Sequence, residues 1–145
     1  MPKVKINDIS MYYELHGEGE PIVLISGFSV DHISWQFIVD LLKSQYQLLL
    51  LDNRGAGQTD VPEGPYSINQ MAEDIVGLCA EVGIEKAHFV GNSMGGFLTQ
   101  TLAYRYPALV KSAIISNSAI QMQKTCFHLF LEAQLAFRKS NVPLD

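Results

Sequence analysis

The chain has 145 residues, 48% hydrophobic and 17% charged, with a formal net charge of −5. This composition is typical of a folded domain with one sizeable core and excludes an intrinsically disordered chain. The acidic balance and the scattered lysines and arginines exclude a basic stripe for nucleic acid, and no apolar run is long enough to span a membrane. The N-terminal stretch MPKVKINDIS has no apolar signal core, so we expect a cytoplasmic protein without nucleic-acid or membrane partners.

Strand-like and helix-like patterns alternate along the sequence. The expected elements, in chain order, are strands over residues 4–7, 11–15 and 22–26, a helix over 34–43, a strand over 47–52, a helix from Ser67 to about Gly83, a strand over 87–90, a helix over 93–106 and a strand over 113–117. Ser67 and Gln70 have the spacing of a capping box, and Pro107 ends the helix before it. This order predicts an α/β fold whose mostly parallel sheet, of about six strands, is covered by helices on both faces.

The segment after residue 119 has a helical pattern with apolar residues on two sides, which predicts packing partners on two sides. It holds one of the two cysteines, Cys126, whereas Cys79 lies on the apolar face of the helix that begins at Ser67. Their spacing fits neither a disulfide framework nor a metal site. We therefore expect two reduced structural thiols and no metal.

The stretch AHFVGNSMGGFLTQ, residues 87–100, places a lone hydroxyl where a strand passes into a helix. A Gly-x-Ser-x-Gly pattern in that context predicts a nucleophile elbow, a sharp turn that holds the serine in a strained backbone conformation. Side chains two positions before and after the serine would collide, and Gly91 and Gly95 meet that need. Ser93 would then lie at a helix N-terminus, where backbone N–H groups favour a developing oxyanion.

Three motifs in order, SGFSVDHISW, DNRGAGQTD and GNSMGG, give the chain a clear resemblance to the N-terminal portion of an α/β-hydrolase over residues 4–119. This superfamily includes esterases, lipases, enol-lactonases and carbon-carbon bond hydrolases. The resemblance implies that Ser93 is the catalytic nucleophile and that the backbone N–H groups of Phe28 and Met94 form the oxyanion hole. It also implies a small ester-like substrate and no metal or organic cofactor.

Two positions depart from the family pattern. Ser26 stands where a histidine usually precedes the oxyanion glycine, and its hydroxyl is expected to organise the loop by a hydrogen bond. Asn92 replaces the commoner histidine beside the nucleophile. Asp52, Arg54 and Gly55 are expected to shape a structural turn, again by resemblance.

The serine lacks recognisable partners in this sequence. In this fold the chain order is serine, acid and histidine, yet after Ser93 the chain offers only His128, Glu132 and Asp145, none of which follows a strand. We therefore interpret the chain as part of a domain of roughly 250 residues, with the hydrolase core over 1–119, the start of a cap over 120–145, and the C-terminal core strands absent. The strand over 113–117 is then an open edge for the C-terminal remainder or a second copy to cover.

Three functions remain open at this stage. The first is a serine hydrolase that acts on an ester, thioester, lactone or activated carbon-carbon bond through an acyl-enzyme on Ser93. The second is a non-catalytic binding scaffold or an inactive fragment, which the missing acid and base favour. The third is cofactor-free oxygen or halide chemistry on the same scaffold. His16 and His32 are expected in loops and His88 at the start of a strand, all structural or exposed, with His32 also a candidate for the pocket wall.

Overall fold

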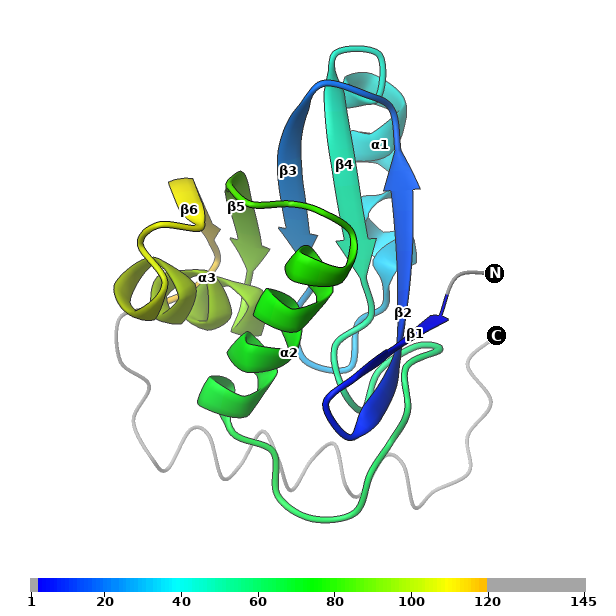
Figure 1. Cartoon of the computed structure of the whole chain (residues 1–145), viewed down its shortest axis with the longest axis vertical. Helices are drawn as coiled ribbons and strands as arrows, with labels where there is room; N and C mark the ends of the chain where they lie inside the picture. Colours follow the sequence, from blue (N-terminus) through cyan, green and yellow to red (C-terminus); the bar gives the residue numbers. More distant parts are fainter. Residues whose placement is uncertain (1–2, 120–145) are drawn as a thin grey trace.

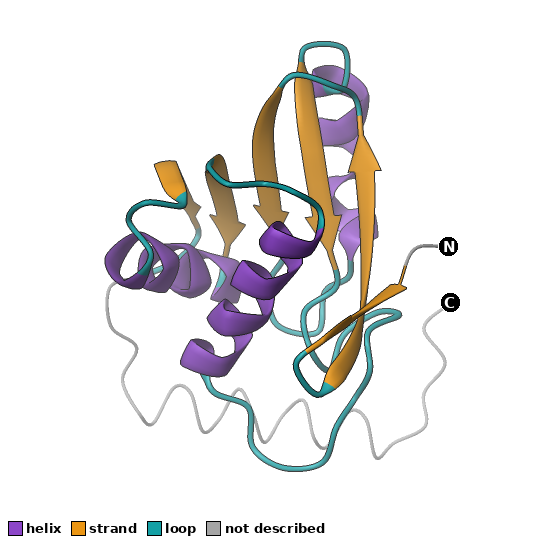
Figure 2. Ribbon diagram, in the orientation of Figure 1, coloured by secondary structure: helices purple, strands orange, loops and turns teal. Residues whose placement is uncertain are grey.

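The structure is a computed structural model that describes residues 3–119. Its centre is a six-stranded sheet with the order β1-β2-β4-β3-β5-β6, and helices lie on both faces (Figures 1 and 2). The elements are β1 (Lys3–Ile6), β2 (Ile9–His16), β3 (Glu20–Ile25), the 3-10 helix η1 (His32–Trp35), α1 (Gln36–Leu42), β4 (Tyr46–Leu51), α2 (Ile68–Glu81), β5 (Ala87–Asn92), α3 (Met94–Arg105) and β6 (Val110–Ser116). The expected α/β class is confirmed.

The sheet is parallel in its centre and antiparallel at one side. β4, β3, β5 and β6 pair in parallel, whereas β1 pairs antiparallel with β2, and β2 pairs antiparallel with β4. A tight turn at Asn7, with φ of 51°, joins β1 to β2. The parallel strands need longer crossovers, which the helices provide. As a result, the ends of β3 and β5 that precede helices lie at the same edge of the sheet.

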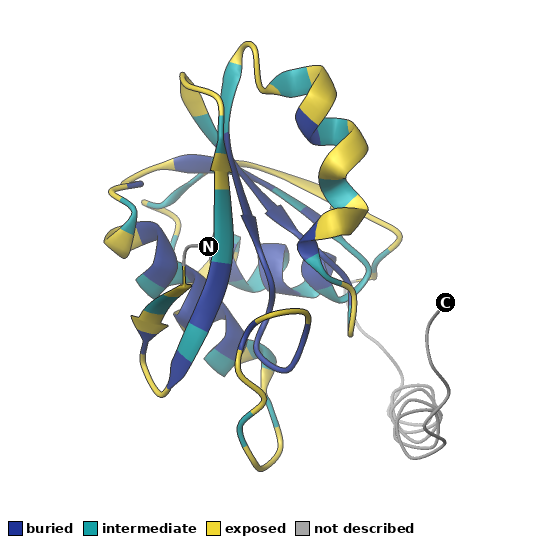
Figure 3. Ribbon diagram, turned by 90° about the vertical axis from the view of Figure 1, so that its right-hand side faces the viewer, coloured by how far each residue is buried: buried dark blue, intermediate teal, exposed yellow. Residues whose placement is uncertain are grey.

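Two apolar clusters, one on each face, hold the layers together. α2 and α3 pack on one face, where the fully buried Ile75 and Leu98 meet Val23 and Phe89 of the sheet. On the other face Val39 of α1 packs on alternate residues of β3 and β4. Figure 3 shows the buried strands between these layers. The apolar face predicted for the helix that begins at Ser67, with Cys79 on it, is therefore the buried face of α2.

Some boundaries differ from the prediction. The helix expected over 34–43 is split, because the Asp31 side chain accepts a hydrogen bond from the Ile33 N–H and caps a separate 3-10 turn. His32 therefore lies in η1 and not in a loop. His16 is the last residue of β2, where it pairs with Leu48, so the prediction that both histidines lie in loops is wrong. Ser67 does cap α2, since its hydroxyl accepts a hydrogen bond from the Gln70 N–H at 3.0 Å.

The turn after β4 is fixed by a buried guanidinium. Arg54 donates to Asp74 of α2 at 2.7 Å and to Asp8 of the β1–β2 turn at 2.7 Å. These hydrogen bonds, above all the one that Asp74 accepts and then the one that Asp8 accepts, raise the pKa of Arg54, so the guanidinium stays charged. The structural role expected for this turn is therefore confirmed for Arg54.

β6 forms an open edge of the described sheet. All but the first of its residues are exposed, including Ile114 at 58% and Ile115 at 44%. This agrees with the open edge expected over 113–117. The predicted cap over 120–145, with Cys126, His128, Glu132 and Asp145, lies outside the described residues, so the division at residue 119 stays a prediction.

Candidate active site

Ser93 occupies the sharp turn between β5 and α3. Its φ and ψ are 55° and −117°, a region that costs free energy for any residue with a Cβ atom. The Ser93 N–H donates to the Ser116 carbonyl oxygen, and the Ser93 carbonyl oxygen accepts from the Gly96 N–H, both at 2.9 Å. The serine is half-buried, so it is not enclosed in dense packing. This conformation is the strained elbow expected from the sequence.

The two glycines that flank the serine leave no room for a side chain. A methyl group on Gly91 would lie 2.1 Å from the Gly95 carbonyl oxygen, and one on Gly95 would lie 2.1 Å from the Ile25 carbonyl oxygen. Both contacts are far inside van der Waals distance, and both are with backbone atoms that cannot rotate away. The close approach of α3 to β3 and β5 at this turn thus requires hydrogen at both positions.

The loop after β3 passes directly beside the serine. A methyl group on Gly27 would lie 3.2 Å from Ser93 Cβ and 3.7 Å from Ser93 Oγ. The Ser26 hydroxyl donates to the Asp31 carbonyl oxygen at 3.1 Å, which is the organising hydrogen bond expected from this departure. Phe28, which follows Gly27, lies in a turn and is half-buried. Gly27 and Ser93, which are 66 residues apart in the sequence, therefore lie side by side in the fold.

Met94 is the first residue of α3 and is half-buried. The N–H groups in the first turn of a helix have no acceptor within the helix, and the helix dipole adds partial positive charge there. Phe28 and Met94 thus lie on the two segments that border Ser93. Their role as oxyanion donors is taken up below as a proposal.

The histidines of the described residues are engaged away from Ser93. Of the four histidines in the sequence, His128 lies outside these residues. The nearest polar partners of the others are Glu14 for His16, Asp52 for His32, and Ser112 for His88. The described part of the chain therefore supplies no base to Ser93.

The segment after β6 is polar where it meets the elbow. Asn117 has a φ of 49°, and its amide nitrogen donates to the Asn92 side-chain oxygen at 3.1 Å. Asn92 is thus tied to the end of the neighbouring strand, next to the serine. No acidic residue follows β6 within the described range, as the sequence indicated.

A cavity of about 630 Å³ lies elsewhere, between the C-terminal ends of α2 and α3. Its lining includes Val76, Ile84, Arg105 and Leu109, and no residue of the elbow or of the loop after β3 contributes to it. Among the described residues we therefore place the candidate site at Ser93, where the strained turn lies beside the loop after β3, and not at this cavity.

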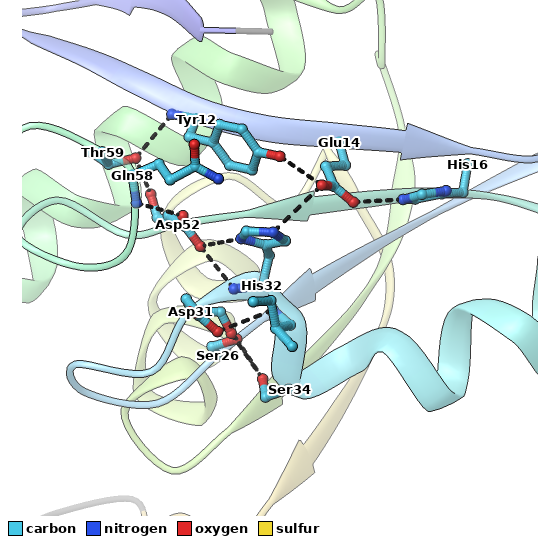
Figure 4. A network of polar contacts seen from close by, with 11 residues as sticks. Tyr12, Glu14, His16, Ser26, Asp31, His32, Ser34, Asp52, Gln58 and Thr59 are labelled. Carbon is cyan, nitrogen blue, oxygen red and sulfur yellow. Dashed lines mark hydrogen bonds and ion pairs between the residues drawn. The ribbon is translucent and has the colours of Figure 1, made fainter. Parts of the chain in front are cut away.

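Sequence reasoning missed a polar network beside the site. Figure 4 shows that Glu14, His32 and Asp52 lie side by side between β2, η1 and the end of β4. The one available signal was the alternation of Tyr12, Glu14 and His16, which puts three polar side chains on one face of a strand. Within residues 3–119 no group of three or more His, Cys, Asp or Glu side chains is arranged to hold a metal ion.

The chain belongs to the alpha/beta hydrolase fold family, whose sequence profile matches residues 20–140. It is 39% identical over 101 residues to 3-oxoadipate enol-lactonase 1 of Acinetobacter baylyi, covering 70% of this chain and 38% of the relative. It is 35% identical over 117 residues to the protein named "Putative carbamate hydrolase RutD" of Azorhizobium caulinodans, covering 81% of this chain and 44% of the relative.

The solved structures agree with this assignment. A hydrolase from Pseudomonas aeruginosa PA01 superimposes with a TM-score of 0.86 at 25% identity, over 92% of this chain and 52% of that one. The chain therefore spans half or less of the curated relatives it matches, as the resemblance to an N-terminal portion implied. In the part of the chain that the structure describes, no helix has the length and apolar character needed to cross a membrane.

Proposed function

We propose that the protein containing this chain is a hydrolase that transfers an acyl group to Ser93. The Ser93 oxygen attacks the carbonyl carbon of an ester-like substrate while a base takes its proton, and the resulting oxyanion is stabilised by the N–H groups of Phe28 and Met94. The tetrahedral intermediate expels the leaving group, which receives the proton. Water then hydrolyses the acyl-enzyme by the same steps and restores the serine.

The observation that carries this proposal is the backbone conformation of Ser93, with φ of 55° and ψ of −117°, which lies outside the left-handed α region. A non-glycine residue is kept in such a conformation only where the surroundings impose it, and such strain concentrates at functional sites. The tight fit of Gly91 and Gly95 supplies that constraint, and Gly27 brings the neighbouring loop next to the hydroxyl. Together these features support a nucleophile at a sharp turn, bordered by the loop that carries Phe28 and by the first turn of α3.

The base and acid are proposed to come from a C-terminal remainder that also covers β6. The match covers less than half of each of these relatives, and Ile114 and Ile115 are exposed on the open strand; both observations support this arrangement. A second copy of the chain is the alternative occupant of the same edge. The relatives named as an enol-lactonase and a carbamate hydrolase favour a small molecule with an ester-like carbonyl as substrate.

The test is Ser93→Ala in the full-length protein, assayed on a short acyl ester and with a fluorophosphonate probe. We expect turnover to fall by about 10⁴-fold or more and labelling to vanish, because the nucleophile is removed. Ser112→Ala is the matched control. Ser112 lies within β6, and its hydroxyl is 2.6 Å from Nδ1 of His88 on β5, so this serine also lies next to a histidine but is not at the turn. Undiminished turnover in Ser93→Ala, or equal loss in Ser112→Ala, would refute the proposal.

A second candidate is a binding scaffold that keeps the fold without the chemistry. The engagement of His16, His32 and His88 with other residues favours it. A scaffold without a base should leave Ser93 unlabelled by the probe even in the full-length protein, because the serine hydroxyl is a weak nucleophile unaided.

A further inference from the structure

The face of β2 that points toward α1 is polar where its neighbours are apolar. Glu14 is aligned with Leu50 of β4 and His16 with Leu48, and both leucines are fully buried in the cluster that contains Val39 of α1. Polar side chains beside such a cluster are costly unless they are hydrogen-bonded. Their partner is η1, which packs against this part of the sheet (Figure 4).

His32 is the residue through which η1 meets this polar face. Its backbone N–H donates to Asp52 Oδ1 at 2.7 Å, and its ring Nδ1 lies 2.8 Å from the same oxygen. On the other side of the ring, Nε2 lies 3.4 Å from Glu14 Oε1. The ring also stacks at a tilt on Tyr12, with centroids 4.7 Å apart. His32 and Asp52 are both buried, so these contacts are shielded from water.

Both acceptors are held in place by other hydrogen bonds. The second Asp52 oxygen accepts from the Gln58 N–H at 2.8 Å, and Glu14 accepts from the Tyr12 hydroxyl at 2.6 Å. Burial would raise the pKa of Glu14, but the hydrogen bonds from Tyr12 and His16 outweigh it and hold the pKa below its usual range. Glu14 thus stays a carboxylate at neutral pH, and the pKa of Tyr12 is raised to about 12.

His32 is also continuous with the loop that borders Ser93. That loop begins at Ser26, whose carbonyl oxygen accepts from Asn53 at 3.3 Å, and it is closed by a hydrogen bond from the Val30 N–H to the Gly27 carbonyl oxygen at 3.3 Å. Neither of these bonds is short. The contacts of His32 with Asp52 and Glu14 attach the far end of the loop to the sheet.

We propose that His32 is a positioning residue: by bridging Asp52 and Glu14 it fixes the loop from Ser26 to Ser34 and so sets the place of the Phe28 N–H relative to Ser93. This role rests on the proposed function, because the position of Phe28 matters only if its N–H receives an oxyanion. It also attaches to the sheet a loop whose Ser26 hydroxyl contacts Asp31 and Ser34 of the loop itself.

Three variants of the full-length protein test this role. His32→Ala removes the bridge, whereas His32→Asn places an amide N–H near the position of Nδ1 and so keeps the bond to Asp52. His16→Ala is the matched control, since His16 hydrogen-bonds Glu14 at 2.8 Å but lies on β2, outside the loop.

We expect His32→Ala to lower kcat by roughly 10-fold to 100-fold while KM changes less than about twofold, because a displaced oxyanion donor weakens transition-state binding more than substrate binding. His32→Asn should recover most of this loss, and His16→Ala should stay within about twofold of the parent. Equal losses of kcat in His32→Ala and His16→Ala would overturn the proposal.

Amide hydrogen exchange gives a second readout that needs no turnover. In a Ser93→Ala background, His32→Ala should speed exchange in the loop from Ser26 to Ser34 by about tenfold or more, and His16→Ala should leave it unchanged. If the alanine variant does not fold, His32→Asn, which lacks the Glu14 contact and the Tyr12 stack, should speed loop exchange about threefold relative to His16→Ala. Equal loop exchange rates in the His32 variants and in His16→Ala would contradict the bridge. Full turnover in Ser93→Ala would contradict the serine chemistry but not the bridge.

Discussion

At the scale of single residues, Ser93 combines a strained backbone with a half-buried position. Its backbone conformation is one that glycine adopts freely and serine does not, and the cost is of the order of 1–3 kcal/mol. A chain selected only for stability would place glycine there. The hydroxyl is thus kept at a site where it opposes folding, which is expected of a residue that acts on a substrate.

We predict that Ser93→Gly is more stable than Ser93→Ala by about 1 kcal/mol, because only glycine relieves the positive φ and this gain exceeds its larger unfolded-state entropy. Urea denaturation of both variants measures the difference. The same comparison at Ser112, which lies within β6 and does not have a positive φ, should favour alanine. A glycine variant less stable than the alanine variant at Ser93 would contradict the strain.

At the scale of elements, the site depends on how closely α3 approaches the sheet. Gly95 lies in the first turn of α3 against the backbone of β3, and Gly77 lies in the middle of α2 against the Ile6 side chain. Both glycines leave room for a neighbouring group. The neighbour of Gly95 is the rigid backbone at Ile25, whereas the neighbour of Gly77 is the side chain of Ile6, which can move. The same added methyl group should therefore have different effects.

We predict that Gly95→Ala lowers the free energy of unfolding by about 3 kcal/mol or more, because its methyl group would lie 2.1 Å from the Ile25 carbonyl oxygen and would push α3 off β3. Gly77→Ala should cost less, since the 2.8 Å contact is with Ile6 Cγ2 and alanine gains about 1 kcal/mol in helix propensity. Thermal and urea unfolding compare the two. Equal destabilisation would show that backbone contact at Gly95 is not decisive.

At the scale of the whole molecule, β1 and β6 are the two outer strands of the described sheet. β6 is the longer of the two, and it exposes the apolar side chains of Ile114 and Ile115. Such an edge is prone to pair with another chain. The cytoplasmic location expected from the sequence stays a prediction at this scale.

We predict that the isolated 145-residue chain self-associates through β6. Ile114→Lys should raise the dissociation constant by roughly tenfold, because a charged side chain on an edge strand opposes pairing. Val61→Lys is the control, since Val61 is 62% exposed but lies in the loop after β4. Sedimentation at several concentrations measures the effect, and a chain that stays monomeric throughout would contradict the prediction.

The sequence by itself determined the alternation of elements and the elbow. Apolar periodicity reports which face of a helix or strand is buried, and the Gly91, Ser93 and Gly95 spacing reports a local steric requirement, so both are encoded within a few residues. Element boundaries at His16 and His32 were wrong because the cap from Asp31 and the register of β2 with β4 decide them.

Only the tertiary structure decided what surrounds the elbow. The approach of Gly27 to Ser93 and the bridge from Glu14 through His32 to Asp52 join residues that are far apart in the sequence, and each depends on strand order and register. A shift of β2 by one residue would turn Glu14 to the opposite face of the sheet. Local patterns carry no record of that register, because it is fixed by the packing of both faces together.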